Sequence, residues 1–281
     1  MNLRPELQRP PELFYDAKES KKYNSSSRMI AIQAEIASRA IELLNIPAGE
    51  RKLILDVGCG SGLSGNALEE AGHAWLGIDI SRDMLDVAQE RDSVVGDLCQ
   101  QDMGMGLPFR PASFDGCISI SALQWLCYAT TAKDNPRHRL QTFFSSLYSV
   151  LKRTARAALQ FYPADADQAI LIAQSATRAG FSGGLVVDYP NSSKAKKYYL
   201  CLSFEHSYKV PKGLGAGPSD SGAIRAESRE TFRPKSKRRK GARPAVKSRD
   251  WIKQKKEKQM RQGKEVRPDS KFTGRKRSRR L

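Results

Sequence analysis

The stretch LILDVGCGSGLSG, residues 53–65, carries the clearest indication of the fold class in this sequence. It begins with an apolar run typical of a buried strand, reaches the acid Asp56, and continues into a turn with glycines at positions 58, 60, 62 and 65. A strand, a glycine-rich turn and a helix in this order form a nucleotide-binding unit, because glycine lets the backbone approach a ligand without a Cβ clash. The lysine of a phosphate-binding P-loop is missing after Gly62, which argues against a nucleoside triphosphatase.

Strand and helix patterns alternate along the chain on both sides of this turn. We expect helices at 29–44, 61–71, 81–90, 135–151 and 167–179, and strands at 52–57, 73–80, 94–103, 114–121, 155–162, 184–189 and 197–204. Repeated strand–helix units predict a Rossmann-like α/β fold, with a mostly parallel seven-stranded sheet covered by helices on both faces. The strand within 94–103 is expected at an edge of this sheet.

The formal net charge of +18 lies entirely in the last part of the chain. Residues 1–204 carry 22 Lys+Arg and 22 Asp+Glu, whereas residues 205–281 carry 26 and 8. We therefore divide the chain into an N-terminal extension (1–27), a domain (28–204) and a basic tail (205–281). The tail has too few apolar residues for a core and is expected to be largely disordered on its own, apart from a short basic helix within 249–262.

Two clusters in the tail concentrate its charge, KSKRRK at 235–240 and GRKRSRR at 274–280. A polyanion relieves the self-repulsion of such a segment, so the clusters favour contacts with RNA phosphates. They also resemble nuclear import signals.

Several other functions are disfavoured by the composition. No apolar run is long enough for a transmembrane helix, and the N-terminus lacks the apolar core of a secretory signal, so no membrane association is expected. The five cysteines are scattered without a CxxC pair and read as reduced thiols. The three histidines show no metal-ligand spacing, and no metal site is expected.

Further motifs follow the glycine turn in order. Asp79 ends the second strand in LGIDIS, 19 residues after Gly60, where an acid can accept hydrogen bonds from both ribose hydroxyls. Asp102 and Met103 are expected to end the third strand, and GLPFRPASFDGCISI (106–120) leads into the fourth. Each acid has an ordinary reading: Asp56 could only cap the turn, and Asp79 could be a surface acid. Their ordered coincidence instead favours one ligand site.

This set of motifs resembles that of the Rossmann-like class I methyltransferases, which depend on S-adenosylmethionine. The resemblance implies that cofactor contacts come from Asp56, Gly58, Gly60, Asp79, Ile80, Asp102, Met103 and Ser119. Common signatures for exocyclic-amine, cytosine-C5 and ribose acceptors are missing. An acceptor that already exposes a lone pair needs none of them, and N7 of guanine is one, because transfer to it requires only an in-line position.

Four longer segments carry a closer resemblance, and they span nearly the whole chain. PPELFYD (10–16), ISISALQWLC (118–127), AGFSGGLVVDYPNSSKAKKYYLCL (179–202) and RPDSKFTGRKR (267–277) are similar to the eukaryotic 18S ribosomal RNA (guanine-N7) methyltransferase family. The chain departs from methyltransferases of this fold at 152–155, where Lys-Arg-Thr-Ala replaces a glycine-rich turn.

The resemblance implies methylation of N7 of a guanine in 18S rRNA, with support for pre-rRNA processing and for small-subunit (40S) biogenesis and export. It implies a nuclear and nucleolar location with a cytoplasmic share, and a heterodimer with a small zinc-binding activator subunit. Ser119, Gln124 and Trp125 would line the site where the guanine enters.

Two alternatives stay open at this point. Trp125 could pack in the core instead of stacking on a ligand, since aromatic faces suit both. The chain could also be a non-catalytic assembly factor that binds pre-rRNA and uses the cofactor fold as a scaffold. A small-molecule methyltransferase is disfavoured by the basic tail.

Overall fold

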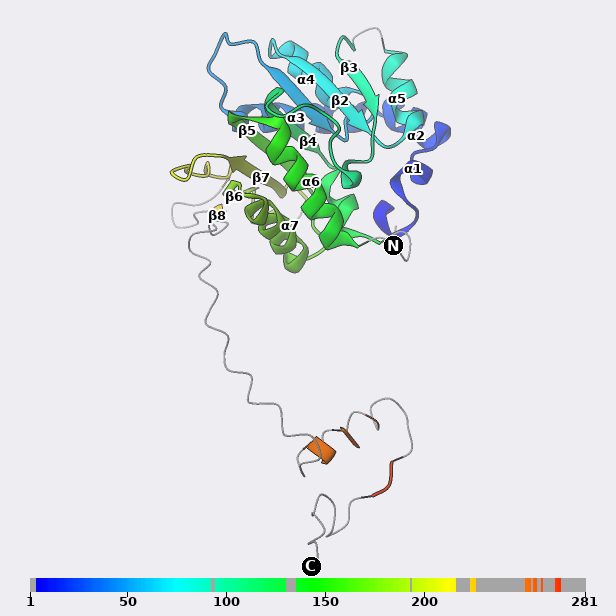
Figure 1. Ribbon diagram of the computed structural model, residues 1–281. Helices are drawn as coiled ribbons and strands as arrows, with labels where there is room; N and C mark the ends of the chain where they lie inside the picture. Colours follow the sequence, from blue (N-terminus) through cyan, green and yellow to red (C-terminus); the bar gives the residue numbers. More distant parts are fainter. Residues whose placement is uncertain are drawn as a thin grey trace, which may run out of the picture. The chain divides into compact units, whose positions relative to one another are not determined.

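The computed structural model describes residues 4–91, 94–129, 135–192, 194–215, 223–225, 251–253, 255–256, 259 and 266–268. The chain divides into two units, Met1–Thr231 and Phe232–Leu281 (Figure 1). In the second unit, residues 251–253, 255–256 and 259 are helical, in agreement with the short helix expected there. The clusters at 235–240 and 274–280 lie outside the described residues. The boundary drawn at residue 204 rests on charge, and the first unit continues beyond it.

One sheet of eight strands forms the centre of the first unit, in the order β3-β2-β1-β4-β5-β7-β6-β8. The strands are β1 (Leu53–Val57), β2 (Ala74–Asp79), β3 (Asp97–Gln100), β4 (Phe114–Ile120), β5 (Leu151–Phe161), β6 (Ser182–Asp188), β7 (Lys197–Ser203) and β8 (Ala223–Arg225). Strands β3, β2, β1, β4 and β5 pair in parallel, and β7 runs antiparallel to both of its neighbours. The mostly parallel sheet is confirmed, and β3 lies at its edge as expected.

Helices cover both faces of this sheet. They are α1 (Pro11–Phe14), α2 (Ala17–Ser25), α3 (Ser27–Leu44), α4 (Leu63–Glu70), α5 (Arg82–Gln89), α6 (Pro136–Val150) and α7 (Ala166–Ala179), with short 3-10 turns η1 (Pro5–Leu7), η2 (Met103–Met105) and η3 (Leu123–Cys127). Leu55 and Val57 pack with α6 and α7, whereas Ile54, which directly precedes Leu55, packs with α3 and α4. This alternation along β1 produces two apolar layers, one on each face. Helices α6 and α7 lie together on one face (Figure 1).

Some element boundaries differ from the expectations. The third strand ends at Gln100 rather than at Asp102, because the Asp102 carboxylate accepts a hydrogen bond from Gly104 N (2.8 Å) and caps η2. The fifth strand begins at Leu151, directly after α6, so residues 152–155 belong to the strand instead of a turn. The short β8 was not expected; it pairs antiparallel with β6 and adds an eighth strand.

A segment at the N-terminus, residues 4–25, crosses the carboxyl ends of the strands; we call it the N-terminal strap. Arg4 donates to the carbonyl oxygens of Tyr162 and Pro163 at 3.1 and 3.0 Å, just beyond β5. Asn24, near the other end, accepts from Arg91 at 2.6 Å, beyond α5. The strap is therefore held near β5 at one end and near α5 at the other, so it spans the row of parallel strands.

A buried ion pair fastens the first residues of the basic tail to the sheet. Arg39 of α3 donates to the Asp188 carboxylate at 3.0 Å, and the two side chains are only 10% and 3% exposed. Asp188 also accepts from the backbone N of Leu214 at 2.8 Å.

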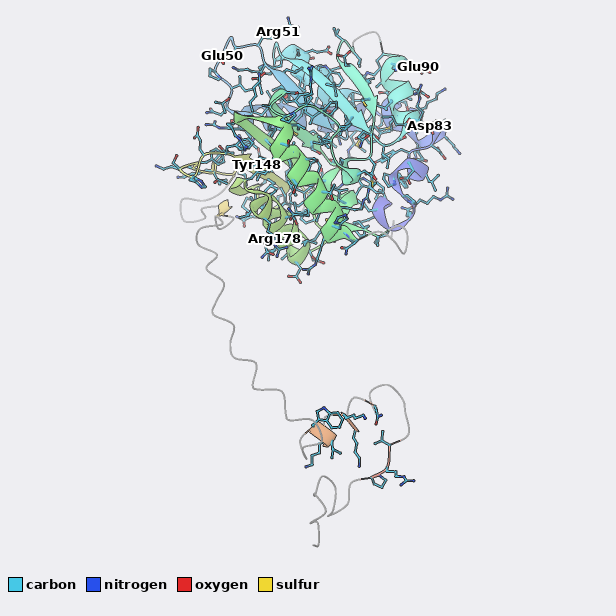
Figure 2. All side chains as sticks on the ribbon, viewed as in Figure 1. Glu50, Arg51, Asp83, Glu90, Tyr148 and Arg178 are labelled. Atoms are coloured by element: carbon cyan, nitrogen blue, oxygen red, sulfur yellow. The ribbon has the colours of Figure 1, made fainter. Side chains whose placement is uncertain are left out.

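Other charged side chains, such as Glu50 and Glu90, lie on the outside of the unit (Figure 2). No helix within the described residues is apolar and long enough to cross a membrane.

Candidate active site

The glycine turn between β1 and α4 holds its backbone in a conformation that side chains disfavour. Gly58 and Gly60 have φ angles of +74° and +53°. A Cβ on Gly58 would lie 2.2 Å from the Cβ of Ala122, and one on Gly60 would lie 2.9 Å from Met84 Cε. Conformation therefore favours glycine at both positions, and space favours it at Gly58 in addition, because the flexible end of Met84 can move away from position 60; both glycines line the pocket described below.

Asp79 lies at the carboxyl end of β2 and fixes this turn. Its carboxylate accepts hydrogen bonds from the backbone N of Gly60 (2.9 Å) and of Ser81 (2.8 Å). Desolvation raises the pKa of Asp79, and these backbone donors oppose that rise because they favour the charged form. Each carboxylate oxygen keeps a second lone pair, with which it can accept from a hydroxyl group of a ligand.

Asp102 faces the same pocket and is held by Arg139 of α6. The guanidinium Nη2 donates to both carboxylate oxygens of Asp102, at 2.8 and 2.9 Å. The sequence motifs did not predict Arg139, because it belongs to a helix whose first turn is brought over Gly104 only in the folded chain.

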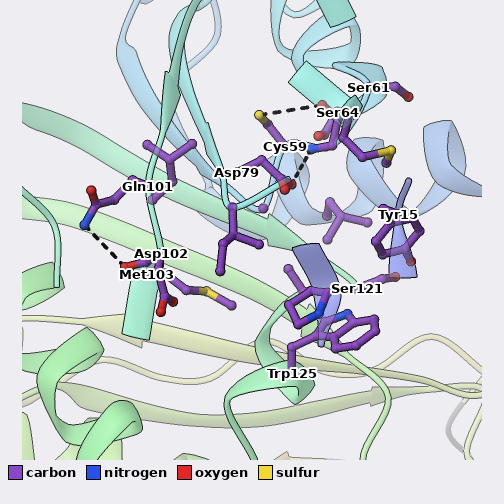
Figure 3. A pocket seen from close by; sticks show the side chains of 18 of the residues that line it. Tyr15, Cys59, Ser61, Ser64, Asp79, Gln101, Asp102, Met103, Ser121 and Trp125 are labelled. Carbon is purple, nitrogen blue, oxygen red and sulfur yellow. Dashed lines mark hydrogen bonds between the residues drawn. The ribbon is translucent and has the colours of Figure 1, made fainter. Parts of the chain in front are cut away.

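The pocket lies at the carboxyl ends of β1, β2 and β4, where the strand order reverses, which is the usual ligand position in such sheets. It encloses about 870 Å³ of empty space, including the part open to solvent. It is lined by Pro11, Tyr15, Tyr23, Gln33, Gly58, Cys59, Gly60, Ser61, Leu63, Ser64, Ile78, Asp79, Ile80, Met84, Gln101, Asp102, Met103, Ile120, Ser121, Ala122, Trp125, Leu126 and Arg139. Asp102 and Met103 lie toward one end, Tyr15 and Trp125 toward the other, and Asp79 lies between them (Figure 3).

The expected site residues divide into two groups. Gly58, Gly60, Asp79, Ile80, Asp102, Met103 and Trp125 line the pocket, whereas Asp56, Ser119 and Gln124 do not. Ser119 is fully buried, and its hydroxyl donates to Val57 O at 2.7 Å. Gln124 is buried and donates to Ser121 O at 2.8 Å. These side chains lie behind the pocket wall and support it.

Asp56 is the most unusual of the residues behind the wall. It is fully buried, and one of its carboxylate oxygens accepts from the Ser64 hydroxyl at 2.6 Å. The other oxygen has no hydrogen-bond partner among the described residues. Desolvation raises the pKa of Asp56 to about 7, against a smaller lowering by the Ser64 hydrogen bond, so this carboxyl titrates near neutral pH.

The N-terminal strap supplies lining residues that we did not assign from the sequence. Tyr15 and Tyr23 both line the pocket, although PPELFYD was used only as a family motif. The ring of Tyr15 lies 6.0 Å from that of Trp125. Trp125 itself is only 7% exposed, so it both packs in the interior and presents a surface to the pocket.

Comparisons with known proteins show the family to which the chain belongs. Residues 55–159 match the model of a methyltransferase domain, and residues 204–279 match the model described as a methyltransferase involved in Williams-Beuren syndrome. The 18S rRNA (guanine-N(7))-methyltransferase of Mus musculus is 56% identical, over 98% of this chain and 96% of its own length. This chain belongs to the same methyltransferase family. The 18S rRNA (guanine(1575)-N(7))-methyltransferase of Saccharomyces cerevisiae is 48% identical, over 99% of both chains.

The chain is thus an S-adenosylmethionine-dependent methyltransferase. Its fold is shared by a TehB-like methyltransferase from Corynebacterium glutamicum, which has a TM-score of 0.51 and 19% identity over 68% of this chain and all of that one.

The pocket residues fit this cofactor. The carboxylate of Asp79 can accept from ribose hydroxyls, and the side chains of Met84 and Met103 offer apolar surface to a purine ring. The buried hydroxyl of Ser61 has no partner among the described residues, and it lines the pocket as a polar group available to a ligand.

Proposed function

We propose that the chain transfers a methyl group from S-adenosylmethionine to N7 of a guanine in 18S rRNA. Near-full-length identity of 48–56% to enzymes named for this reaction carries the proposal. When bound, S-adenosylmethionine supplies a sulfonium methyl; the N7 lone pair forms the new C–N bond while the C–S bond breaks, its electron pair stays on sulfur, and the positive charge passes to the guanine.

The pocket chemistry supports an acceptor that needs no general base. No histidine is found among the described lining residues, and both lining carboxylates already accept hydrogen bonds, Asp79 from backbone and Asp102 from Arg139. Burial raises the pKa of the Cys59 thiol, which keeps it protonated. No proton leaves N7 during methylation, so these residues act by binding and orientation.

Individual roles follow from positions in the pocket. Asp79 would hold the ribose, while Asp102, steadied by Arg139, would accept from the adenine amino group beside Met103. Asp56, Ser119 and Gln124 would act as positioning residues: Ser119 ties β4 to β1, and Gln124 ties η3 to the end of β5 through Tyr162 N (3.4 Å).

The partners belong to the same proposal. The basic tail would bind phosphates of 18S rRNA in the small-subunit precursor, which gives affinity rather than sequence choice. A small zinc-binding activator subunit would pair along β3, whose outer edge has no strand partner among the described residues. The protein would act in the nucleus and nucleolus, with a cytoplasmic share, and support pre-rRNA processing and 40S export.

A second candidate is an assembly factor whose presence, rather than its chemistry, is needed. The tail carries the whole net charge, and this observation suits RNA binding without catalysis equally well. The two roles separate in cells that carry only an Asp79→Asn variant. Asn keeps one acceptor oxygen but turns an NH2 group toward the backbone N–H of Gly60 or Ser81, so cofactor binding should fail. The loss of folding stability should be smaller than in Asp79→Ala, which leaves both backbone donors without an acceptor.

The measurement is N7-methylguanine in 18S rRNA, mapped by chemical cleavage at the modified base, together with the amount of 40S subunits. Loss of methylation with normal subunit production means that both roles coexist. Persisting methylation in cells whose variant binds no cofactor refutes the enzymatic role of this chain. Asp83→Asn, at a partly exposed position in the first turn of α5 that does not line the pocket, is the matched control.

A further inference from the structure

Tyr15, a residue of the N-terminal strap, lines one end of the cofactor pocket. Its ring lines the pocket and meets Trp125 at 61° and Tyr23 at 85°, with centroid distances of 6.0 and 6.1 Å. Figure 3 shows Tyr15 and Trp125 at the end opposite Asp102 and Met103. With adenine at Asp102 and ribose at Asp79, the methionine part of the cofactor would extend toward this aromatic end.

The backbone holds Tyr15 in this place. Its carbonyl oxygen accepts from the hydroxyl of Ser81 at 2.9 Å and from that of Ser20 at 3.2 Å. Ser81 is also the N-cap of α5 and follows Asp79 by two residues, so the strap is joined to the connection between β2 and α5 that carries Asp79. Together with the outer anchors at Arg4 and Asn24, this contact fixes the ring over the crevice.

The aromatic end is suited to a positive charge. Arg139 is the only basic side chain among the described lining residues, and its charge is paired with Asp102 at the other end. Burial raises the pKa of the Tyr15 phenol, with Tyr23 and Asp79 adding to the rise, so the ring remains a neutral phenol. A cation placed against the face of such a ring is stabilised by its quadrupole, the more so when water is excluded.

We propose that Tyr15 is a catalytic residue, delivered by the N-terminal strap, whose ring contacts the sulfonium-bearing end of the cofactor and the base that receives the methyl group. The ring faces a cation before the transfer, on sulfur, and after it, on the methylated guanine. The contact with the sulfonium requires only that the chain binds S-adenosylmethionine. The contact with the base rests on the proposed function.

Binding of two ligands tests this contact without any RNA. S-adenosylmethionine and S-adenosylhomocysteine differ by one methyl group and one positive charge, so their affinity ratio reports what lies at the sulfur. In the full-length chain, Tyr15→Leu should lower the affinity for S-adenosylmethionine about 3- to 30-fold more than that for S-adenosylhomocysteine, measured by isothermal titration calorimetry. Tyr15→Phe, which keeps the ring, should leave the ratio unchanged.

Phe14→Leu is the matched control. Phe14 lies at the same ring distance from Trp125, 6.0 Å, but does not line the pocket. Its removal should leave the ratio unchanged. Equal loss for both ligands in Tyr15→Leu, or an equal change of the ratio in Phe14→Leu, would overturn the proposal. Tyr15→Met provides a second aliphatic variant if circular dichroism shows that Tyr15→Leu does not fold.

Methyl transfer to 18S rRNA provides the second readout. Tyr15→Leu should lower kcat at saturating cofactor, whereas Phe14→Leu should not. If the wild-type chain binds the cofactor but transfers no methyl group to guanine, the proposed function fails while the ligand ratio still decides the role of Tyr15. If the chain methylates guanine and the ratio does not move, the role of Tyr15 fails alone.

Discussion

Replacement of Gly58 by Ala tests how the glycine turn shapes the cofactor pocket. A Cβ at φ +74° costs about 1–2 kcal/mol in the left-handed region. The new Cβ also lies 2.2 Å from Ala122 Cβ, so the two groups must separate by roughly 1.2 Å to reach the 3.4 Å of ordinary contact. Overpacking of this kind costs about 1–3 kcal/mol more. We expect a total loss of about 2–5 kcal/mol of unfolding free energy.

Gly72→Ala is the matched control, because Gly72 has a φ of +83° with nothing within 4 Å of an added Cβ. It should lose only the conformational part, about 1–2 kcal/mol. Urea denaturation gives both values, and calorimetry with S-adenosylhomocysteine should show weaker binding for Gly58→Ala alone, since Ala122 lines the pocket. Adding Ala122→Gly should restore the part lost to the clash. Equal losses at Gly58 and Gly72, or no rescue by Ala122→Gly, would show that contact with the Ala122 side chain does not restrict position 58.

Three further predictions concern buried charge and the tail. Because the pKa of Asp56 is raised to about 7, the folded state binds more protons than the unfolded state between about pH 4 and 7, so this carboxyl should lower stability as pH rises, by on the order of 4 kcal/mol over the whole range. Urea denaturation at pH 5 and pH 8 should show roughly 2–3 kcal/mol of this loss in the wild type and a smaller loss in Asp56→Asn, and parallel profiles would contradict it. Asp188→Ala should cost about 3 kcal/mol, because the buried Arg39 guanidinium keeps only the exposed Glu42 as a carboxylate partner and the backbone N of Leu214 loses its acceptor; Asp86→Ala, in an exposed pair, should cost less than about 1 kcal/mol. Deletion of 235–281 should weaken RNA binding and flatten its dependence on salt, and an unchanged slope in filter-binding assays would argue against a phosphate-binding tail.

Local patterns in the sequence predicted the site residues that lie at or just beyond the carboxyl ends of the strands. The glycine turn, Asp79 and Asp102 each sit where a parallel strand stops, and such ends meet at one edge of a sheet. The motif around the end of β4 did not predict which of its side chains face the pocket and which face the interior. Ser119 points into the interior toward Val57 O, and it is Ile120 and Ser121 that reach the pocket.

Residues brought in by distant elements could not be found in this way. Arg139 comes from α6 and Tyr15 from the strap, and neither has a spacing to the glycine turn that a local pattern could reveal. The pairing of β8 with β6 likewise depends on the chain returning to the sheet beyond the charge boundary at 204, because three residues carry no readable strand pattern.

The central claim is methyl transfer to guanine N7 of 18S rRNA. The most direct test uses the full-length chain, purified with its bound partners, labelled S-adenosylmethionine, and two 18S transcripts that differ only in guanosine or 7-deazaguanosine, which has carbon in place of N7. We expect label in the guanosine transcript at a single position, none in the 7-deaza transcript, and none with Asp79→Asn. Equal labelling of both transcripts would contradict it, since the acceptor would then be another atom.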